Sequence, residues 1–470
     1  MSCFPLGSRR ASGFEVRAFY TEDDNSGNHT TGMVRRSKSL WVLSCLFIIA
    51  LNSLVVLVLI PAAGHLMGSS YSLDTYVDGY DWLAANLANG HGFRMYPETA
   101  PTLMREPGYP IVLAGIFRAF GKSLTAVKLT NMILALGVAF LMTRITRRLS
   151  RSPLLIFGPS LIFLFHPETL IAESRGSVEI LFAFMLTLYI LTVYRAVKTS
   201  RWWDFLLSGG VLGMTVLVRS TPILFPLFLT GYLLLVERGK GQKIMILRNV
   251  TIMMIAMFVV LSPWIIRNYL LTAKFVPTAS VLGLAAHTGL YFSTHPQMGF
   301  VQIDGDAARE RNKLAHDLGY HFRDGYYQYF YSSADELAFS HYLFNRVMST
   351  YEHSPLLFAK TVIRNLFSFW CGGKTWKSVV MDAIVQLPLA ALATMAVVLC
   401  LRNGQIRIVA PMALLIIYIM AVSVPILAQA RYCAPLIPFL SILACMAIAA
   451  ALKKFKGATY TVPENAFSPL

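Results

Sequence analysis

The sequence is poor in charged residues. Only 14% of its 470 residues are charged, whereas 56% are hydrophobic and the mean hydropathy is +0.56. Soluble globular domains carry about 25% charged residues. The shortage of charge therefore excludes a chain built of ordinary soluble domains and indicates a protein surrounded mostly by lipid.

Acidic residues are scarcer than basic ones. The chain has 24 acidic and 41 basic residues, which gives a formal net charge of +17 at pH 7. In a soluble protein this excess would indicate a nucleic-acid partner. Here the basic residues lie between the apolar runs, in alternate loops, and no nucleic-acid motif occurs. The charge therefore predicts membrane topology, with attraction to anionic lipid headgroups as a second consequence.

The sequence also lacks cysteines at the spacing of a metal site or redox motif. No CxxC pair occurs, and most of the six cysteines lie within apolar runs: Cys3, Cys45, Cys371, Cys400, Cys433 and Cys445. Structural zinc sites and redox motifs need closely spaced pairs. We therefore interpret the cysteines as small hydrophobic residues of the core.

Apolar runs of membrane-spanning length recur along the chain. A span needs about 20 apolar residues. This length predicts about ten spans, at 40–62, 123–146, 153–168, 177–197, 203–218, 221–236, 245–266, 378–401, 407–428 and 433–452. The third, fifth and sixth are short, so we expect them to bend, tilt or stop at a water-filled cavity.

Basic residues mark every second connection between these spans. With the amino terminus in the cytosol, the basic connections at 144–151, 195–201, 237–243 and 402–407 are cytoplasmic, as the positive-inside rule requires. The first periplasmic loop is then 63–122, and the second long periplasmic segment is 267–377. We expect residues 39–452 to form the membrane domain, between a disordered cytoplasmic tail at 1–38 and a cytoplasmic tail at 453–470.

The first periplasmic loop predicts amphipathic helices beside the membrane. The helical spacing of its first part is carried by Tyr76, Tyr80, Leu83, Ala84 and Leu87. Asn89-Gly90 ends this pattern. A second apolar stretch, 109–120, is too short to span. Both stretches are expected to lie in the membrane interface.

An acidic loop beside a membrane fits transfer of a sugar from a lipid-borne phosphate. A carboxylate must take the proton of the acceptor hydroxyl, and cations must stabilise the departing phosphate. Asp74 and Asp78 share a face if the helix begins by Asp74, and either is a candidate base. The structural alternatives are a helix cap at Asp74 and a solvated helix face. Arg105 is the candidate cation, with Glu106 as its alternative partner.

Several short motifs occur in an order that resembles bacterial GT-C glycosyltransferases, the relatives of protein O-mannosyltransferases and of the aminoarabinose transferase that modifies lipid A. The resemblance covers residues 70 to 440. The motifs are DGYDWLAANLANGHGF at 78–93, REPGYP at 105–110, EILF at 179–182, GVLGMTVLVR at 210–219, PWIIRNY at 263–269 and RYCAPLIP at 431–438.

The resemblance implies a polyprenyl-phosphate sugar donor, an inverting transfer at the periplasmic face and a catalytic acid in the first loop. The family commonly places this acid a few residues before the tyrosine matched here by Tyr80. In this chain Asp74 lies farther from Tyr80 than that spacing, and Asp78 lies closer to it. Both therefore remain candidates for the base.

The resemblance also points to arginines that bind the donor phosphate. Arg105 occupies the position of a cation near the phosphate, and Arg267 and Arg431 match arginines at the outer membrane boundary. Anchoring to lipid headgroups is the structural alternative for Arg267 and Arg431. The same two roles, phosphate binding and anchoring to lipid headgroups, are open for Arg219. Its position between two short spans favours phosphate binding.

The remaining candidates also have structural alternatives. Glu179 matches an acidic position at the outer end of a span, and pairing with Arg175 is its alternative role. The aromatic run 326–331 fits sugar stacking, although interfacial packing is the more common role. The histidines show no HxxxH or HExxH spacing. Some relatives use a divalent metal ion, and a site built from residues distant in sequence stays open.

The sequence therefore predicts an all-α, polytopic GT-C membrane enzyme of the bacterial inner membrane, with its active site on the periplasmic face. It would transfer a sugar from a polyprenyl-phosphate donor to a glycan, lipid or protein acceptor. A transporter or flippase for a lipid-linked or small substrate is the first alternative, because it too has short, broken spans. A membrane scaffold whose periplasmic segments bind a partner is the second.

Overall fold

A computed structural model describes residues 46–62, 75–150, 152–237, 239–295, 304–373 and 375–455. The chain from Asn52 onward forms one compact unit. It is almost entirely helical. In the described residues the strands are β1 (Phe322–Arg323) and β2 (Tyr329–Phe330), which pair antiparallel with Phe322 opposite Phe330.

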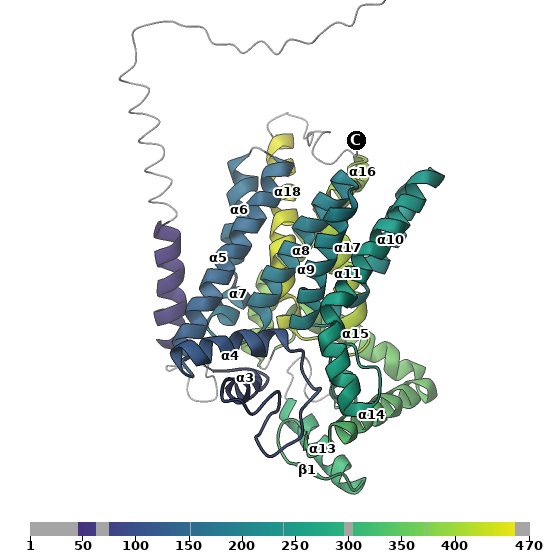
Figure 1. The fold of residues 1–470 in the computed structure, drawn as a ribbon. Coiled ribbons are helices and arrows are strands. Elements are labelled where there is room, and N and C mark those ends of the chain that lie inside the picture. Colours follow the sequence, from purple (N-terminus) through teal and green to yellow (C-terminus); the bar gives the residue numbers. More distant parts are fainter. Residues whose placement is uncertain are drawn as a thin grey trace, which may run out of the picture. The chain divides into compact units, whose positions relative to one another are not determined.

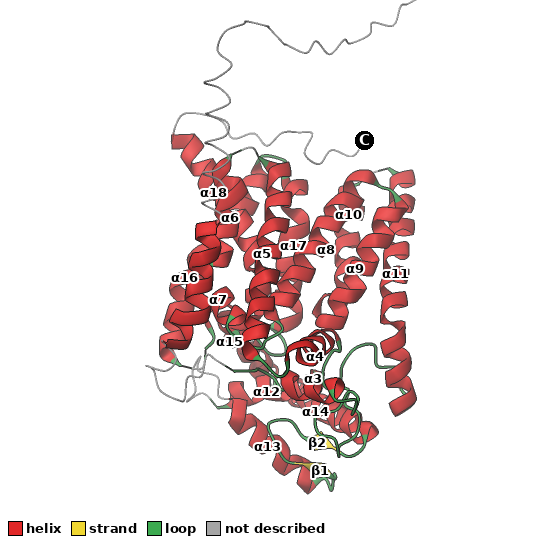
Figure 2. Ribbon diagram, turned by 60° about the vertical axis from the view of Figure 1, so that its left-hand side comes forward, coloured by secondary structure: helices red, strands yellow, loops and turns green. Residues whose placement is uncertain are grey.

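A bundle of apolar helices makes up most of this unit, and these helices run roughly parallel in Figures 1 and 2. Six described helices are long and apolar enough to cross a membrane, or seven if one bent pair counts as a span. The bundle helices are α5 (Leu124–Leu149), α6 (Pro153–Leu164), α8 (Glu179–Thr199), α9 (Trp202–Val218), α10 (Phe225–Val236), α11 (Lys240–Thr272), α16 (Trp376–Arg402), α17 (Ile406–Ser423) and α18 (Ile437–Phe455).

Each of the ten predicted apolar segments contains a described helix. The first is described as Leu46–Ala62, which includes the π-helical segment η1 (Val55–Leu59). The fifth and sixth are short, as predicted: α9 has 17 residues, and α10 has 12 and follows the 3₁₀ turn η3 (Thr221–Leu224). The prediction of an all-α polytopic membrane protein is confirmed.

The third predicted span is broken. Helix α6 bends by 57° into α7 (Pro167–Glu173), because Pro167 has no N–H to continue the helix. Two buried asparagines bond to carbonyl groups at the two ends of α7: Asn52 Nδ2 donates to Leu164 O, before the bend, at 3.3 Å, and Asn131 Nδ2 donates to Arg175 O, after α7, at 2.8 Å. The bend expected from the short, proline-containing run is confirmed.

The other helices gather at one end of the bundle, the lower end in Figures 1 and 2. They are α3 (Tyr80–Ala88), α4 (Gly108–Phe120), α12 (Leu282–Thr294), α13 (Asp304–Asp317), α14 (Ser333–His353) and α15 (Pro355–Cys371). Helix α4 leaves an apolar face exposed: Ile111 and Phe120 are exposed, whereas Tyr109 and Leu113 on its other face are buried. An apolar helix face left exposed beside a membrane bundle fits the interfacial position predicted for residues 109–120.

The two long connecting segments pack together into one lobe at this end. Their shared hydrophobic cluster contains residues of the first segment and of the second: Leu83, Phe93, Met95, Met104, Leu284, Ala315, Phe322, Tyr327, Phe330, Phe339 and Leu343. Residues more than 200 positions apart in sequence therefore support the same surface, and side chains from both segments can meet in one site.

Candidate active site

Asp78 is held by a strained turn that precedes α3. Asp78 has φ of 62° and Gly79 has φ of 73°, so both lie in the left-handed region. Asp is one of the few non-glycine residues that tolerate this conformation. Just before the turn, Gly176 N donates to Thr75 O at 3.0 Å and Val77 N donates to Gly176 O at 3.1 Å. These backbone bonds hold Asp78 beside the α7–α8 connection.

The predicted helix start at Asp74 is not supported. Helix α3 begins only at Tyr80, and two consecutive left-handed residues cannot continue a right-handed helix backwards. The argument that Asp74 and Asp78 share a helix face was therefore wrong. Asp74 lies outside the described residues, and Asp78 is the candidate whose surroundings are known.

The Asp78 carboxylate is surrounded by cations and a phenol. Arg431 Nη1 lies 3.0 Å from Oδ2, Arg105 Nη2 lies 3.8 Å from Oδ1, and the Tyr327 hydroxyl donates to Oδ1 at 3.4 Å. Burial alone would raise the pKa of Asp78, but the charges of Arg431 and Arg105 outweigh it and lower this pKa to about 2. Asp78 is therefore ionised at neutral pH.

Arg105 is placed by a rigid turn that docks on the end of α9. Its guanidinium carbon lies 4.8 Å from the centre of the Tyr327 ring and 5.3 Å from that of Tyr80. The adjacent Glu106 accepts a hydrogen bond from Ser220 N at 2.9 Å. At Gly108 a Cβ atom would lie 2.8 Å from the Leu217 carbonyl oxygen, so this close approach requires glycine.

Arg431 reaches Asp78 from the opposite part of the chain. It lies on the 3₁₀ turn η5 (Ala430–Tyr432), just before η6 (Ala434–Leu436) and α18. Arg431 Nε donates to Gln429 Oε1 at 2.7 Å, which orients the guanidinium. The Arg431 side chain remains 30% exposed, compared with 14% for Asp78. Part of the Arg431 side chain is therefore accessible from solvent.

Arg219 adds a third positive charge. It follows the last residue of α9, and its guanidinium carbon lies 4.6 Å from the centre of the Tyr432 ring. Arg431 contacts the same ring at 5.8 Å. The charge of Arg219 also contributes to the low pKa of Asp78. Three arginines from distant loops thus concentrate positive charge beside one carboxylate.

The remaining predicted site residues, Tyr80, Glu179 and Arg267, have different surroundings from one another. Tyr80 lies within the site, under Arg105 and edge-on to Tyr109 at 5.1 Å. Glu179 is buried at the start of α8. The pKa of Tyr109 is raised mainly by the burial of Tyr109 and secondly by the charge of Glu179. Arg267 stacks over Trp264 at 4.4 Å and donates to Phe93 O at 3.5 Å. Arg267 therefore fastens the first segment to α11, and its guanidinium is engaged away from Asp78.

Comparison with known proteins bears on what this charged site does. Residues 99–266, which include Arg105 and Arg219, match the model of the dolichyl-phosphate-mannose-protein mannosyltransferase family. This match supports a membrane glycosyltransferase of the GT-C type. No curated protein matches the chain. The family match ends before Arg431 and begins after Asp78, so the roles of those two residues depend on the geometry.

Tyr327 was not singled out by sequence reasoning. Its hydroxyl donates to Asp78 and accepts a hydrogen bond from Arg105 Nη2, and its side chain is buried. The aromatic run 326–331 was the only sequence signal, and it does not distinguish one tyrosine from its neighbours. The contact depends on the folding of the second segment over the first.

A second residue that sequence reasoning missed supports the loop of Arg105. The buried Glu336 of α14 accepts hydrogen bonds from Thr102 Oγ1 at 2.7 Å, Leu103 N at 2.9 Å and Ser280 Oγ at 2.8 Å. Burial raises the pKa of Glu336, whereas these hydrogen bonds oppose the rise. Glu336 thus ties the segment before Arg105 to the lobe, which makes it a structural acid rather than a reacting group.

The part of the chain that is described shows no cluster of metal ligands. No three His, Cys, Asp or Glu side chains there come close enough to hold one ion. The charged groups facing Asp78 are arginines, which bind phosphate oxygens in a fixed fork. A carboxylate beside several such forks is suited to proton transfer next to a bound phosphate.

Proposed function

We propose that this GT-C enzyme transfers a sugar from a polyprenyl-phosphate carrier to a hydroxyl group of an extracytoplasmic glycan, lipid or protein. Asp78 is the general base, and Arg431 and Arg105 bind the donor phosphate, with Arg219 adding positive charge. The observation that carries this proposal is the position of the ionised Asp78 carboxylate, which lies 3.0 Å from Arg431 and 3.8 Å from Arg105.

The reaction balances with these groups. The acceptor hydroxyl gives its proton to Asp78 as its oxygen forms a bond to the anomeric carbon. The bond from that carbon to the phosphate oxygen breaks, and its electron pair leaves with polyprenyl phosphate. The arginines stabilise the negative charge that develops on this leaving group. Attack from the face opposite the phosphate inverts the configuration of the sugar.

The low pKa of Asp78 applies to the site without a bound donor. A carboxyl with a pKa of about 2 is a weak base, and efficient general bases have a pKa nearer to the working pH. When a donor phosphate binds Arg431 and Arg105, these arginines would pair with the phosphate and stabilise the Asp78 carboxylate less. The phosphate would also add a negative charge beside Asp78. Both changes raise the pKa of Asp78, so the donor itself makes the base effective.

The distribution of basic residues supports a site outside the cytosol. The α5–α6, α8–α9, α10–α11 and α16–α17 connections, which carry the basic runs, lie at the end of the bundle opposite α3 and α4 (Figure 2). Such connections face the cytosol in most membrane proteins. We therefore place the site on the periplasmic side of a bacterial inner membrane.

Cysteine labelling tests this orientation. A membrane-impermeant maleimide added outside spheroplasts should label His91→Cys, which lies in the loop after α3, and should not label Asn403→Cys in the α16–α17 connection. Both positions are exposed, so access decides the outcome. The reverse pattern would contradict the proposed orientation.

Polyprenyl-phosphate mannose is the donor to test first, because the matching family is described as a dolichyl-phosphate-mannose-protein mannosyltransferase. The full-length protein, reconstituted in vesicles with radiolabelled donor and a membrane extract as acceptor, should form a covalent mannosylated product. Asp78→Asn should abolish the product without loss of folded protein. Asp81→Asn is the matched control, because Asp81 lies in the same loop but pairs with Lys122 at 2.7 Å.

Full activity of Asp78→Asn would remove this carboxylate from the mechanism. Movement of labelled donor across sealed vesicles with no covalent product would favour the transporter or flippase alternative. Absence of both transfer and transport in the unaltered protein would favour a scaffold.

A further inference from the structure

Tyr327, in the second long segment, touches the proposed reacting groups. Its hydroxyl lies between Arg105 Nη2 and Asp78 Oδ1, and its ring lies under the Arg105 guanidinium at 4.8 Å. The side chain is 6% exposed. A buried phenol that hydrogen-bonds to a cation and to a carboxylate restricts the directions in which both can point.

Helix α13 contacts residues on either side of Tyr327. We call Arg311, Asn312 and His316 of this helix the α13 clamp. Arg311 Nη2 donates to Tyr326 O at 3.4 Å, Asn312 Nδ2 donates to Gly325 O at 3.1 Å, and His316 Nε2 lies 3.0 Å from Asp324 Oδ1. Asn312 Oδ1 also accepts a hydrogen bond from Gln328 Nε2. Two of these contacts hold the backbone just before Tyr327, and the other two hold the side chains of Asp324 and Gln328, so the segment around Tyr327 has little freedom.

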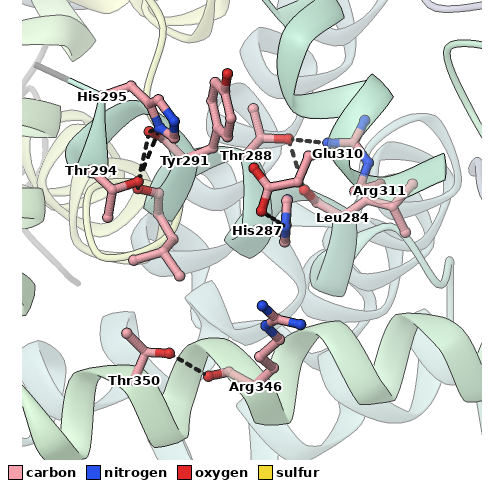
Figure 3. Close-up of polar contacts among 11 residues, drawn as sticks. Leu284, His287, Thr288, Tyr291, Thr294, His295, Glu310, Arg311, Arg346 and Thr350 are labelled. Atoms are coloured by element: carbon pink, nitrogen blue, oxygen red, sulfur yellow. Dashed lines mark hydrogen bonds and ion pairs between the residues drawn. The ribbon is translucent and has the colours of Figure 1, made fainter. Parts of the chain in front are cut away.

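The clamp is itself fastened to the lobe (Figure 3). Arg311 is 2% exposed, and its Nη1 donates to Thr288 Oγ1 of α12 at 2.7 Å. His287 of α12 lies 3.6 Å from Glu310 of α13. Burial, Arg311 and Arg346 lower the pKa of His287 to about 3, so this imidazole is neutral at neutral pH. The α12–α13 contact therefore does not depend on a charged histidine.

We infer that Tyr327 is a positioning residue for transfer: fixed by the α13 clamp, it holds Asp78 and Arg105 in the geometry in which the carboxylate can take the acceptor proton. This inference rests on the proposed function. It assigns to the second long segment a role in positioning the reacting groups, in addition to its packing role. Tyr327 acts through Asp78 and Arg105 and need not touch the donor.

Tyr327→Phe removes only the hydroxyl and tests the inference in the reconstituted full-length protein. With polyprenyl-phosphate mannose as the probe, kcat should fall by about 10- to 100-fold, as expected for loss of hydrogen bonds to charged groups. Binding of sugar-free polyprenyl phosphate should change by less than about threefold, because both arginines remain. The matched control is Tyr331→Phe, an exposed tyrosine near the same hairpin, which should behave as the unaltered protein.

A pH profile separates positioning from a merely structural role. The charged and titratable groups near Asp78 are Arg105, Arg431, Arg219, Tyr80 and Tyr327. Loss of the Tyr327 hydroxyl removes a donor to the carboxylate, which raises the pKa of Asp78. The acid limb of kcat should therefore move to higher pH in Tyr327→Phe and stay unchanged in Tyr331→Phe.

Asn312→Ala tests the clamp without touching Tyr327. It removes the bonds to Gly325 and Gln328, so kcat should fall in the same direction but by less than in Tyr327→Phe. In the double variant the loss should equal that of Tyr327→Phe alone, because both changes act through one hydroxyl.

Three results would overturn the inference. They are an unchanged kcat and pH profile in Tyr327→Phe, a loss of polyprenyl phosphate binding as large as that of an Arg431 variant, or fully additive losses in the double variant. The proposed function is tested separately, by the activity of Asp78→Asn. If Asp78→Asn is inactive and Tyr327→Phe is normal, only the role of Tyr327 fails.

Discussion

Arg431 Nη1 lies 3.0 Å from Oδ2 of Asp78, although 353 positions separate the two residues in the chain. The pair joins the loop before α3 to the turn before α18. In our account, one guanidinium therefore contacts the proposed base and also binds the donor phosphate. Binding of the donor and activation of the base become linked through this residue.

The arginines of the site should determine affinity for the lipid phosphate. Arg431→Gln should weaken binding of polyprenyl phosphate by about 10- to 100-fold, because hydrogen bonds to charged groups contribute about 1.5 to 3 kcal/mol. Arg267→Gln is the matched control, since Arg267 is engaged with Phe93 and Trp264. It should lower the melting temperature and leave this affinity nearly unchanged. Equal losses in both variants would show that the effect is not specific to the site.

Removal of the proposed base should have the opposite effect on binding. Asp78 competes with a phosphate for Arg431 and Arg105, so Asp78→Asn should tighten binding of polyprenyl phosphate, by about tenfold if the carboxylate costs about 1.4 kcal/mol. The same variant should be inactive in transfer. A titration of labelled polyprenyl phosphate measures the change, and weaker binding than in the unaltered protein would contradict the competition.

The pH dependence should differ between the free enzyme and the donor complex. The profile of kcat/KM for the donor reports the free enzyme, in which the pKa of Asp78 is lowered to about 2, so Asp78 stays ionised over the accessible range. The profile of kcat reports the complex, in which the phosphate raises this pKa. Activity needs the ionised form, so kcat should fall at a higher pH than kcat/KM as the solution is acidified. Coincident acid limbs would mean that the donor does not alter the base.

The close approach of α4 to α9 should be sensitive to one methyl group. In Gly108→Ala the new Cβ would lie 2.8 Å from Leu217 O, a backbone atom that cannot move aside easily. The turn that carries Arg105 must shift, at a cost of about 1 to 3 kcal/mol, so both melting temperature and transfer should fall. Gly115→Ala lies on the same helix with open space around its Cβ and should be neutral or slightly stabilising. Equal behaviour of the two variants would contradict the proposed docking of the turn.

Much of the fold was predictable because lipid imposes a simple rule on sequence. A segment that crosses a bilayer must be apolar and helical, so runs such as those of α5, α8 and α16 show their positions directly. The bend between α6 and α7 was predictable from a short run that contains proline. The outer helices were predictable only as amphipathic segments, because their partners lie far away in sequence.

The candidate site was predictable only in part. Asp78, Arg105 and Arg431 stood out as charges beside apolar runs, but no spacing rule indicates that residues 78 and 431 meet. The left-handed turn at Asp78 and Gly79 was missed because helical periodicity continued through it. Tyr327 was hidden in a run of similar aromatics, and Arg267, whose motif looked equally functional, lies beside Phe93. These differences arise from tertiary packing of the two long segments, which local patterns do not encode.

The structure of the Asp78→Asn variant with polyprenyl-phosphate mannose bound tests the central claim most directly. Our account predicts that the phosphate lies within hydrogen-bonding distance of Arg431 and Arg105 and that the side chain of residue 78 faces the anomeric carbon. A phosphate bound elsewhere, with residue 78 beyond reach of the sugar, would contradict it.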